Sequence, residues 1–374
     1  LKAVAYGRED GADKDADALV NGIQFDAPLP EQTPFTVELP KDFKDASGRT
    51  LRNAESFPLK VATAGLPPLA KFAAAPFGVV ERFAEGPDGP ALLPVTLRNV
   101  EAGLKVQGLQ TGAAPAPTGK VSTLKPSTDA DIIAWFRKVA RYDNYHVQRR
   151  VAARDVKGPL PKVIDDERDH VQTRMLSLLA GQGGVKTLDL PQVTGKELRP
   201  FEVVGIPLPP GFHVVEIASQ KLGASLLDGR HGEGRTMYVR TSALVTNLGV
   251  HFKLGRENAA VWVTSLDKGK PVAAAKVRVS DCRGRELAQA ITNEQGVAMI
   301  EGLSPDAPSC HSNDDYGQGS SAYFVSARHA QGGVEDMAFT WSDWQRGIEP
   351  WRFNVPTSQD PAPDQRAHTV MDRT

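Results

Sequence analysis

Residues 244–303 constrain the fold more than any other stretch, because short β-type runs alternate there with turn signals. In the run that contains Val277 and Val279, apolar residues alternate with polar ones, which places one face on a core and the other in water. Runs of this length, with turns about every 8–12 residues, are typical of an antiparallel β-sandwich. The strands predicted for this stretch are Val250–Leu254, Ala259–Leu266, Val272–Ser280, Glu286–Thr292 and Val297–Ile300.

The same stretch resembles the macroglobulin (MG) domains of bacterial alpha-2-macroglobulins. The resemblance rests on the segments LVTNLGVHFKLGRENAAVWVTSLDKGKPV, DCRGREL and TNEQGVA, and it continues through SDWQRGIEPWRFNVP. The upstream piece GFHVVEIASQKLGASLL also fits the family. The resemblance covers residues 70–374 and, more weakly, the first 70 residues.

This resemblance implies a scaffold rather than an enzyme. In alpha-2-macroglobulins a chain of sandwiches frames a broad-spectrum endopeptidase inhibitor, which traps a protease after the protease cuts a bait region. Many members also hold a thioester between Cys and Gln in a C-x-E-Q motif. Here Asn293 precedes Glu294 and Gln295, and no Cys stands two residues before Glu294. The resemblance therefore implies a fragment that lacks the bait and thioester domains.

The length of 374 residues is too great for one sandwich and suggests several domains. We expect a mainly β protein of tandem antiparallel β-sandwich domains, macroglobulin- or immunoglobulin-like, with one α-helical insertion. The chain begins at Leu1 and ends within a pattern, so we expect a piece of a larger protein. The expected parts are a partial N-terminal sandwich at 1–68, a sandwich at 69–245 with the insertion at about 127–180, an MG sandwich at 246–355, and a linker with the first strand of a following MG domain at 356–374.

Helical periodicity is confined to the expected insertion. Thr128 is suited to cap a helix that runs to about Tyr142 and carries acidic residues in its first turn. A second helix is predicted near Asp165–Ala180, ended by the glycine-rich segment at 181–184. The segment Gly112–Lys125 is rich in Pro, Gly, Ser and Thr and is predicted to be a loop. The apolar stripe of the first helix is Ile132, Ile133, Phe136, Val139 and Ala140, with Trp135 at its edge.

Further strands are predicted on both sides of this insertion. A closing hairpin is expected to turn at residues 331–333, and Trp344 and Trp351 are expected at a seam with a following domain. The remaining predicted strands are Ile23–Phe25, Phe35–Leu39, Phe57–Thr63, Phe77–Phe83, Leu92–Val100, Lys186–Leu190, Glu197–Val204, Gly211–Ser219, Thr236–Val245, Ala322–His329 and Val334–Trp341.

The charge balance argues against several classes of partner. The formal net charge is −1, so there is no electrostatic case for binding nucleic acid or an anionic membrane. No run of about 18 apolar residues is present, so we expect no membrane-spanning helix.

Cys282 and Cys310 are the two cysteines of the chain. They could be reactive thiols, metal ligands, two buried thiols or one structural disulfide. Two isolated cysteines without a histidine cluster make a poor zinc site, so we expect a disulfide. A disulfide would place the protein in the periplasm or outside the cell.

We predict no catalytic, cofactor-binding or metal-binding residues. Neither G-x-S-x-G nor H-E-x-x-H occurs. An EF-hand loop beginning at Asp13 would need Gly and Glu where Ala18 and Gln24 stand. A phosphate-binding loop at 181–187 would need Gly where Val185 stands. The carboxylates at 165–167 are more simply explained as the acidic first turn of a helix than as an acid/base pair.

Isolated histidines and tryptophans also have structural explanations. His213, His251 and His329 lie in predicted strands, and we expect ordinary surface or core histidines rather than metal ligands. Trp262, Trp341, Trp344 and Trp351 could form a platform for carbohydrate, but strand and interface cores are the expected use.

The sequence and the resemblance leave two candidate functions. The first is a scaffold fragment of a periplasmic alpha-2-macroglobulin, a monomer that meets proteases through the full-length protein, for which the resemblance also allows a lipid anchor in the inner membrane. The second is an envelope adhesion module that binds cell-wall polymer or the peptidoglycan-synthesis machinery. An apolar patch of several hundred Å² on the helical insertion would favour the second function.

Overall fold

The structure is a computed structural model in which the chain divides into two compact units, Leu1–Pro68 and Leu69–Thr374. Each unit is described by itself. The residues that the structure describes are 3–5, 23–25, 28–45, 47–82, 91–100, 120–161, 169–188, 202–227, 235–310 and 321–344.

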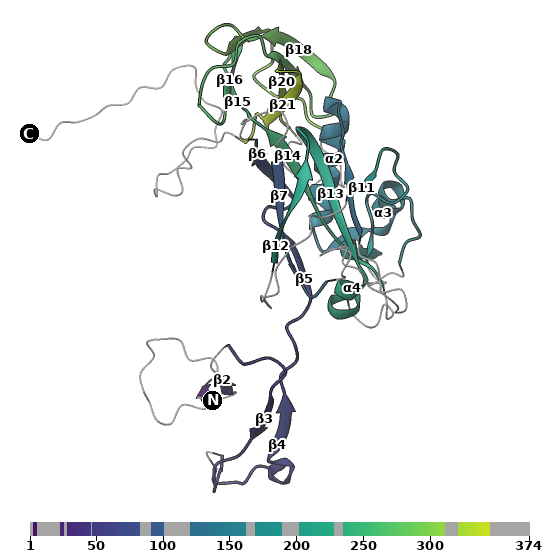
Figure 1. The fold of residues 1–374 in the computed structure, drawn as a ribbon, viewed down its shortest axis with the longest axis vertical. Helices are drawn as coiled ribbons and strands as arrows, with labels where there is room; N and C mark the ends of the chain where they lie inside the picture. The colour runs from purple at the N-terminus through teal and green to yellow at the C-terminus, as the bar shows by residue number, and fades with distance from the viewer. Residues whose placement is uncertain are drawn as a thin grey trace, which may run out of the picture. The chain divides into compact units, whose positions relative to one another are not determined.

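The first unit contains two small antiparallel sheets (Figure 1). One pairs β1 with β2, the other pairs β3 with β4, and three of these strands lie where strands were predicted. None of the residues at 24–68 for which the structure describes burial is buried. A sandwich core for this region therefore stays a prediction. The elements are β1 Ala3–Ala5, β2 Ile23–Phe25, β3 Pro34–Val37, the 3-10 turn Ala54–Ser56 and β4 Leu59–Ala62.

The second unit begins with a sandwich of a five-stranded and a three-stranded sheet. The strand orders are β11-β8-β13-β14-β6 and β12-β7-β5, and β14 and β6 are the parallel pair. The facing sides bury an apolar core that includes Val95, Leu97, Val215 and Ile217. The strands are β5 Leu69–Phe72, β6 Phe77–Glu81, β7 Ala91–Arg98, β8 Lys120–Leu124, β11 Lys186–Leu188, β12 Glu202–Leu208, β13 Gly211–Ser219 and β14 Met237–Thr246.

The predicted insertion is present as the long connection of the β8–β11 hairpin. Its first helix, α2, begins after Thr128, whose hydroxyl accepts a hydrogen bond from the Asp131 N–H, as predicted. The apolar stripe of α2 packs against β13 and β14, so the five-stranded sheet is covered on both faces (Figure 1). The insertion contains α2 Asp129–Asp143, β9 His146–Gln148, α3 Arg149–Asp155, β10 His170–Gln172 and the 3-10 turn Thr173–Met175.

Two predictions in this region are wrong. Part of the predicted loop Gly112–Lys125 is strand β8, in which Val121 and Thr123 point into buried surroundings. The helix predicted for Asp165–Ala180 is absent from residues 169–180, which form β10, one 3-10 turn and extended chain, while residues 162–168 lie outside the described part. Buried hydrogen bonds from Arg240 to backbone carbonyls of this segment outweigh its helix propensity.

A short helix, α4 (Gln220–Leu226), directly follows β13 and was not predicted. Ser219 caps it by accepting a hydrogen bond from the Leu222 N–H at 3.0 Å. No helix in the described part of the chain is long and apolar enough to cross a membrane.

The second sandwich follows the sequence pattern closely. Its sheets have the orders β15-β16-β19 and β18-β17-β20-β21, and the closing hairpin turns at residues 332 and 333 as predicted. Strand β17 begins later than predicted, because Ala274 in the preceding turn has a φ of 56°. The strands are β15 Leu248–Leu254, β16 Asn258–Ser265, β17 Lys276–Ser280, β18 Glu286–Ile291, β19 Val297–Glu301, β20 Phe324–Gln331 and β21 Val334–Trp341.

Candidate functional site at the joint between the two sandwiches

Four buried charged residues hold the parts of the second unit together: Asp129 and Asp336 bond the second sandwich to the insertion and to the first sandwich, and Glu216 and Arg240 lie under the insertion. The described residues contain no group of three or more His, Cys, Asp or Glu side chains that could hold a metal ion. The candidate functional site is the joint between the sandwiches, where buried charges and an aromatic core meet.

The chain passes from the first sandwich to the second at Thr246 and Asn247. The buried carboxylate of Asp336 on β21 accepts hydrogen bonds from the Thr246 hydroxyl at 2.7 Å and the Asn247 N–H at 2.9 Å. Asn247 in turn accepts from the Leu266 N–H at 2.7 Å and, through its side chain, from the Asp267 N–H at 3.0 Å. Since a buried carboxylate is costly unless it is bonded, these contacts fix the direction of the connection.

One aromatic core runs across the joint. Phe77 of the first sandwich lies 5.3 Å from Phe136 of α2 and 5.6 Å from Phe339 of the second sandwich, between ring centroids. Trp344 lies 5.6 Å from Phe77 and 5.8 Å from Phe136. Trp344 was predicted at a seam with a following domain, but here it packs against the preceding sandwich and its insertion; Trp351 lies outside the described residues. The two sandwiches and the insertion thus share one core.

The N-terminus of α2 is seated on the second sandwich. The carboxylate of Asp129, only 2% exposed, accepts a hydrogen bond from the Ser326 hydroxyl at 2.8 Å and pairs with Arg328. Beside it, Gly284 has a φ of +84°, and a Cβ added there would lie 2.4 Å from the Ala130 Cα. Only glycine permits both this backbone conformation and this close approach.

Cys282 and Cys310 lie next to the Gly284 turn. The structure joins them in a disulfide with their Cα atoms 5.9 Å apart, and both residues are buried. Asp281 fixes the same turn, because its Oδ1 accepts hydrogen bonds from the Arg283 and Arg285 N–H groups, each at 2.9 Å. The surface that receives α2 is thus held by a covalent link and a hydrogen-bonded turn.

A buried ion pair holds the insertion on the first sandwich. Glu216 on β13 and Arg240 on β14 are cross-strand partners, and their side chains pair at 3.3 Å while 4% and 5% exposed. Glu216 also accepts from the Leu178 N–H at 2.9 Å, and Arg240 donates to the Thr173 carbonyl at 3.1 Å. Both charges are therefore bonded to the backbone of the insertion as well as to each other.

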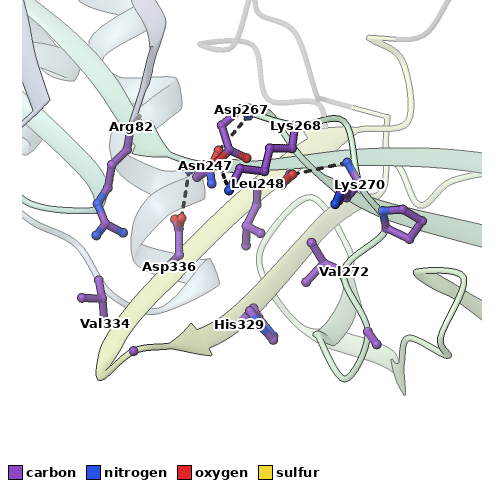
Figure 2. A pocket seen from close by; sticks show the side chains of 14 residues that line it. Arg82, Asn247, Leu248, Asp267, Lys268, Lys270, Val272, His329, Val334 and Asp336 are labelled. Atoms are coloured by element: carbon purple, nitrogen blue, oxygen red, sulfur yellow. Dashed lines mark hydrogen bonds and ion pairs between the residues drawn. The ribbon is translucent and has the colours of Figure 1, made fainter. Parts of the chain in front are cut away.

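A pocket of about 560 Å³ opens beside the joint (Figure 2). Arg82 reaches it from the first sandwich, and Lys268, Lys270 and His329 reach it from the second (Figure 2). Its apolar lining comes from Leu248, Val272, Val334 and neighbouring small residues.

The histidines and tryptophans singled out in the sequence take separate positions. His213 is buried, and burial lowers its pKa to about 4, although the hydrogen bond from Nε2 to the Pro209 carbonyl acts in the opposite direction. His251 lies 5.3 Å from Trp262 on the outer face of β15 and β16, and Trp262 is 44% exposed. Trp341 is fully buried. The tryptophans that the structure describes therefore do not form a common platform for carbohydrate.

Sequence reasoning missed the charged residues that build the joint. Asp336 and Arg240 each stand in a strand most of whose residues are buried, and Asp129 stands in the first turn of α2. A charged residue in a strand with several large apolar residues was the available signal, because a charge that is buried with them needs a partner.

Comparisons with known proteins place the second sandwich in a family. Residues 245–360 match the family model described as the bacterial alpha-2-macroglobulin MG3 domain. No curated protein is significantly similar to the chain.

Similar solved structures include alpha-2-macroglobulins from two bacteria. A crystal structure of the Escherichia coli protein spanning domains NIE-MG1 is 14% identical with a TM-score of 0.35, over 73% of this chain and 96% of that one. A cryo-EM reconstruction of the native E. coli protein is 15% identical with a TM-score of 0.33, and a Salmonella crystal structure is 14% identical with a TM-score of 0.35.

The match to the E. coli reconstruction covers 83% of this chain but only 15% of that protein. The match to the Salmonella protein covers 80% of this chain but only 13% of that protein. TM-scores this low carry no argument about function. The match to the family model confirms the resemblance to bacterial alpha-2-macroglobulins for an MG-domain region of this chain, at residues 245–360.

Proposed function

We propose that this chain is a scaffold segment of a bacterial alpha-2-macroglobulin that inhibits endopeptidases by trapping them. Its own work would be mechanical: it would hold successive domains in a fixed arrangement and would catalyse nothing. The match of residues 245–360 to the MG3 family model supports the family, and the resemblance implies the trapping function.

The main support for this proposal is the joint, which connects the first sandwich, its insertion and the second sandwich. A trap set off by cleavage at one place must pass the change to distant domains, which requires neighbouring domains to move together. Asp336, Asp129 and the aromatic core each join the second sandwich to the first sandwich or its insertion. A flexible linker between the sandwiches would not transmit such a change.

The domain organisation belongs to the same proposal. We place a small β domain at 1–68, a sandwich with its helical insertion at 69–245, an MG sandwich at 246–355 and the start of a further MG domain at 356–374. The Cys282–Cys310 disulfide supports a site of action outside the cytoplasm, such as the periplasm, because disulfides persist in oxidising compartments.

The test is a trapping assay on the complete gene product that contains this chain. A trapped protease should lose activity toward a large protein substrate and keep activity toward a small peptide substrate. Asp336→Ala should reduce this difference, because the Thr246 hydroxyl and Asn247 N–H lose their acceptor. The matched control is Asp306→Ala, an exposed residue of the same sandwich. Trapping would be refuted if the unaltered protein reduced the activities toward the large and the small substrate equally, or reduced neither of them.

The envelope adhesion function finds less support in the insertion. Among the exposed large apolar residues, Tyr145 is the one that belongs to the described part of the insertion. A single exposed aromatic side chain is ordinary for a protein surface and does not make the apolar patch that this function requires.

A further inference from the structure

We infer that the pocket beside the joint binds a carboxylate-rich organic ligand, such as an acidic peptide, and that this ligand braces one sandwich against the other. The inference rests on the proposed role of the joint. It adds a ligand class and a site to that role.

The pocket is built from both sandwiches. Arg82 follows β6 of the first sandwich, and its N–H donates to the Thr246 carbonyl at 2.9 Å. Lys270 lies in the turn after β16, and His329 lies on β20. A ligand that touches both Arg82 and Lys270 therefore bridges the joint (Figure 2).

The positive charges of the pocket are available to a ligand. Within the described part of the chain, the side chains of Arg82 and Lys270 have no hydrogen-bond or ion-pair partner. The Asp336 carboxylate is already engaged, because it accepts three hydrogen bonds. The Asp267 carboxylate lies 3.9 Å from the Lys268 ammonium through Oδ2, while its buried Oδ1 has no hydrogen-bond partner in the described part of the chain. Two free cations on opposite sides of the joint favour a ligand with two anionic groups.

The size and the lining of the pocket favour an organic anion over a simple ion. A volume of about 560 Å³ is within the range of small-molecule sites, about 300–1,000 Å³, and is large for one phosphate. Leu248, Val272 and Val334 supply an apolar surface for the aliphatic part of a ligand (Figure 2). Glutamyl residues combine both features, since a carboxylate stands at the end of an aliphatic stem.

Calorimetric titration of the whole chain tests the inference. The probes are the peptide Glu-Val-Glu, its neutral match Gln-Val-Gln, and inorganic phosphate. We expect Glu-Val-Glu to bind more tightly than either, and to lose about tenfold in affinity with each of Arg82→Gln and Lys270→Gln. Lys253→Gln, an exposed lysine of β15 outside the pocket, is the control and should change affinity less than twofold.

Three results would overturn the inference: no binding of Glu-Val-Glu, equally tight binding of the neutral peptide or of phosphate, or an affinity for Glu-Val-Glu that Arg82→Gln and Lys270→Gln leave unchanged. Thermal unfolding gives a second readout of binding, because a ligand that binds only the folded chain raises the unfolding temperature as its concentration rises. These titrations contain no protease, so a failure of ligand binding is distinguishable from a failure of trapping.

Discussion

The five-stranded sheet of the first sandwich and the strands β16, β17 and β18 of the second differ in how many of their faces are covered. In the first, the insertion and the opposing sheet bury both faces of the five-stranded sheet, and eight of the nine residues of β13 are buried. In the second, β16 alternates, so that Val261 and Val263 are buried while Trp262 is 44% exposed. A charge on a covered face must find a partner inside the protein, whereas one on an open face has water.

Two ion pairs express this difference. Glu216 and Arg240 pair under the insertion, while Arg278 and Glu286 pair at 2.7 Å on the open face of β17 and β18, with side chains 44% and 42% exposed. We expect Arg240→Met to lower the free energy of unfolding by about 3–5 kcal/mol, because it leaves the Glu216 carboxylate buried without its cation. Arg278→Met should cost less than about 1 kcal/mol. Urea unfolding of both variants measures the contrast.

The double variant Glu216→Leu with Arg240→Met distinguishes the cost of an unpaired buried charge from the contribution of the hydrogen bonds that Glu216 accepts. Because no unpaired charge then stays buried, it should be more stable than Arg240→Met alone. A double variant that is less stable than the single one would show that the backbone bonds of Glu216 contribute more than its charge costs.

The next largest effect on stability is expected at Gly284, where α2 closely approaches the second sandwich. Gly284→Ala should destabilise the chain by about 2–4 kcal/mol, since the new methyl adds a clash with Ala130 to the backbone cost of a left-handed conformation. Gly302→Ala is the matched control: its φ is +75° with no atom within 4 Å of the added Cβ, so it should cost only about 1 kcal/mol. Equal losses in thermal unfolding would contradict the seating of α2.

The stability of the first sandwich should also depend on pH through His213. In the unfolded chain His213 binds a proton below its ordinary pKa of 6.5, but in the folded chain only below about 4. Stability is therefore lost as the pH falls between these values, by about 2 kcal/mol at pH 5. His213→Gln should remove this part of the pH dependence, and His251→Gln, at the open face of the other sandwich, should leave it in place.

The smallest effect is expected on the open face. Ile291 on β18 is 66% exposed, so Ile291→Thr should change the free energy of unfolding by less than about 0.5 kcal/mol. A loss of more than about 1 kcal/mol in urea unfolding would show that another part of the chain covers this strand.

The contrast between faces also explains how far the sequence could be interpreted. Strands of the second sandwich were predicted well, because one open face leaves the alternation of residues such as Val277 and Val279 visible. Residues 169–180 were mistaken for helix, because the contacts that hold them extended come from Arg240, which is distant in sequence. The partners of the charged residues at the joint could not be predicted for the same reason: Asp336 meets Thr246, and Asp129 meets Arg328, only in the folded chain.

A distance measurement across the joint tests the central claim that the two sandwiches form one body. Spin labels at the exposed positions Val203 and Met299, on the first and second sandwich, would report the distribution of distances between them, with the native disulfide left intact. We predict one narrow distribution, broadened by Asp336→Ala. A broad distribution in the otherwise unaltered chain would show that the sandwiches move independently and would contradict the scaffold function proposed for the joint.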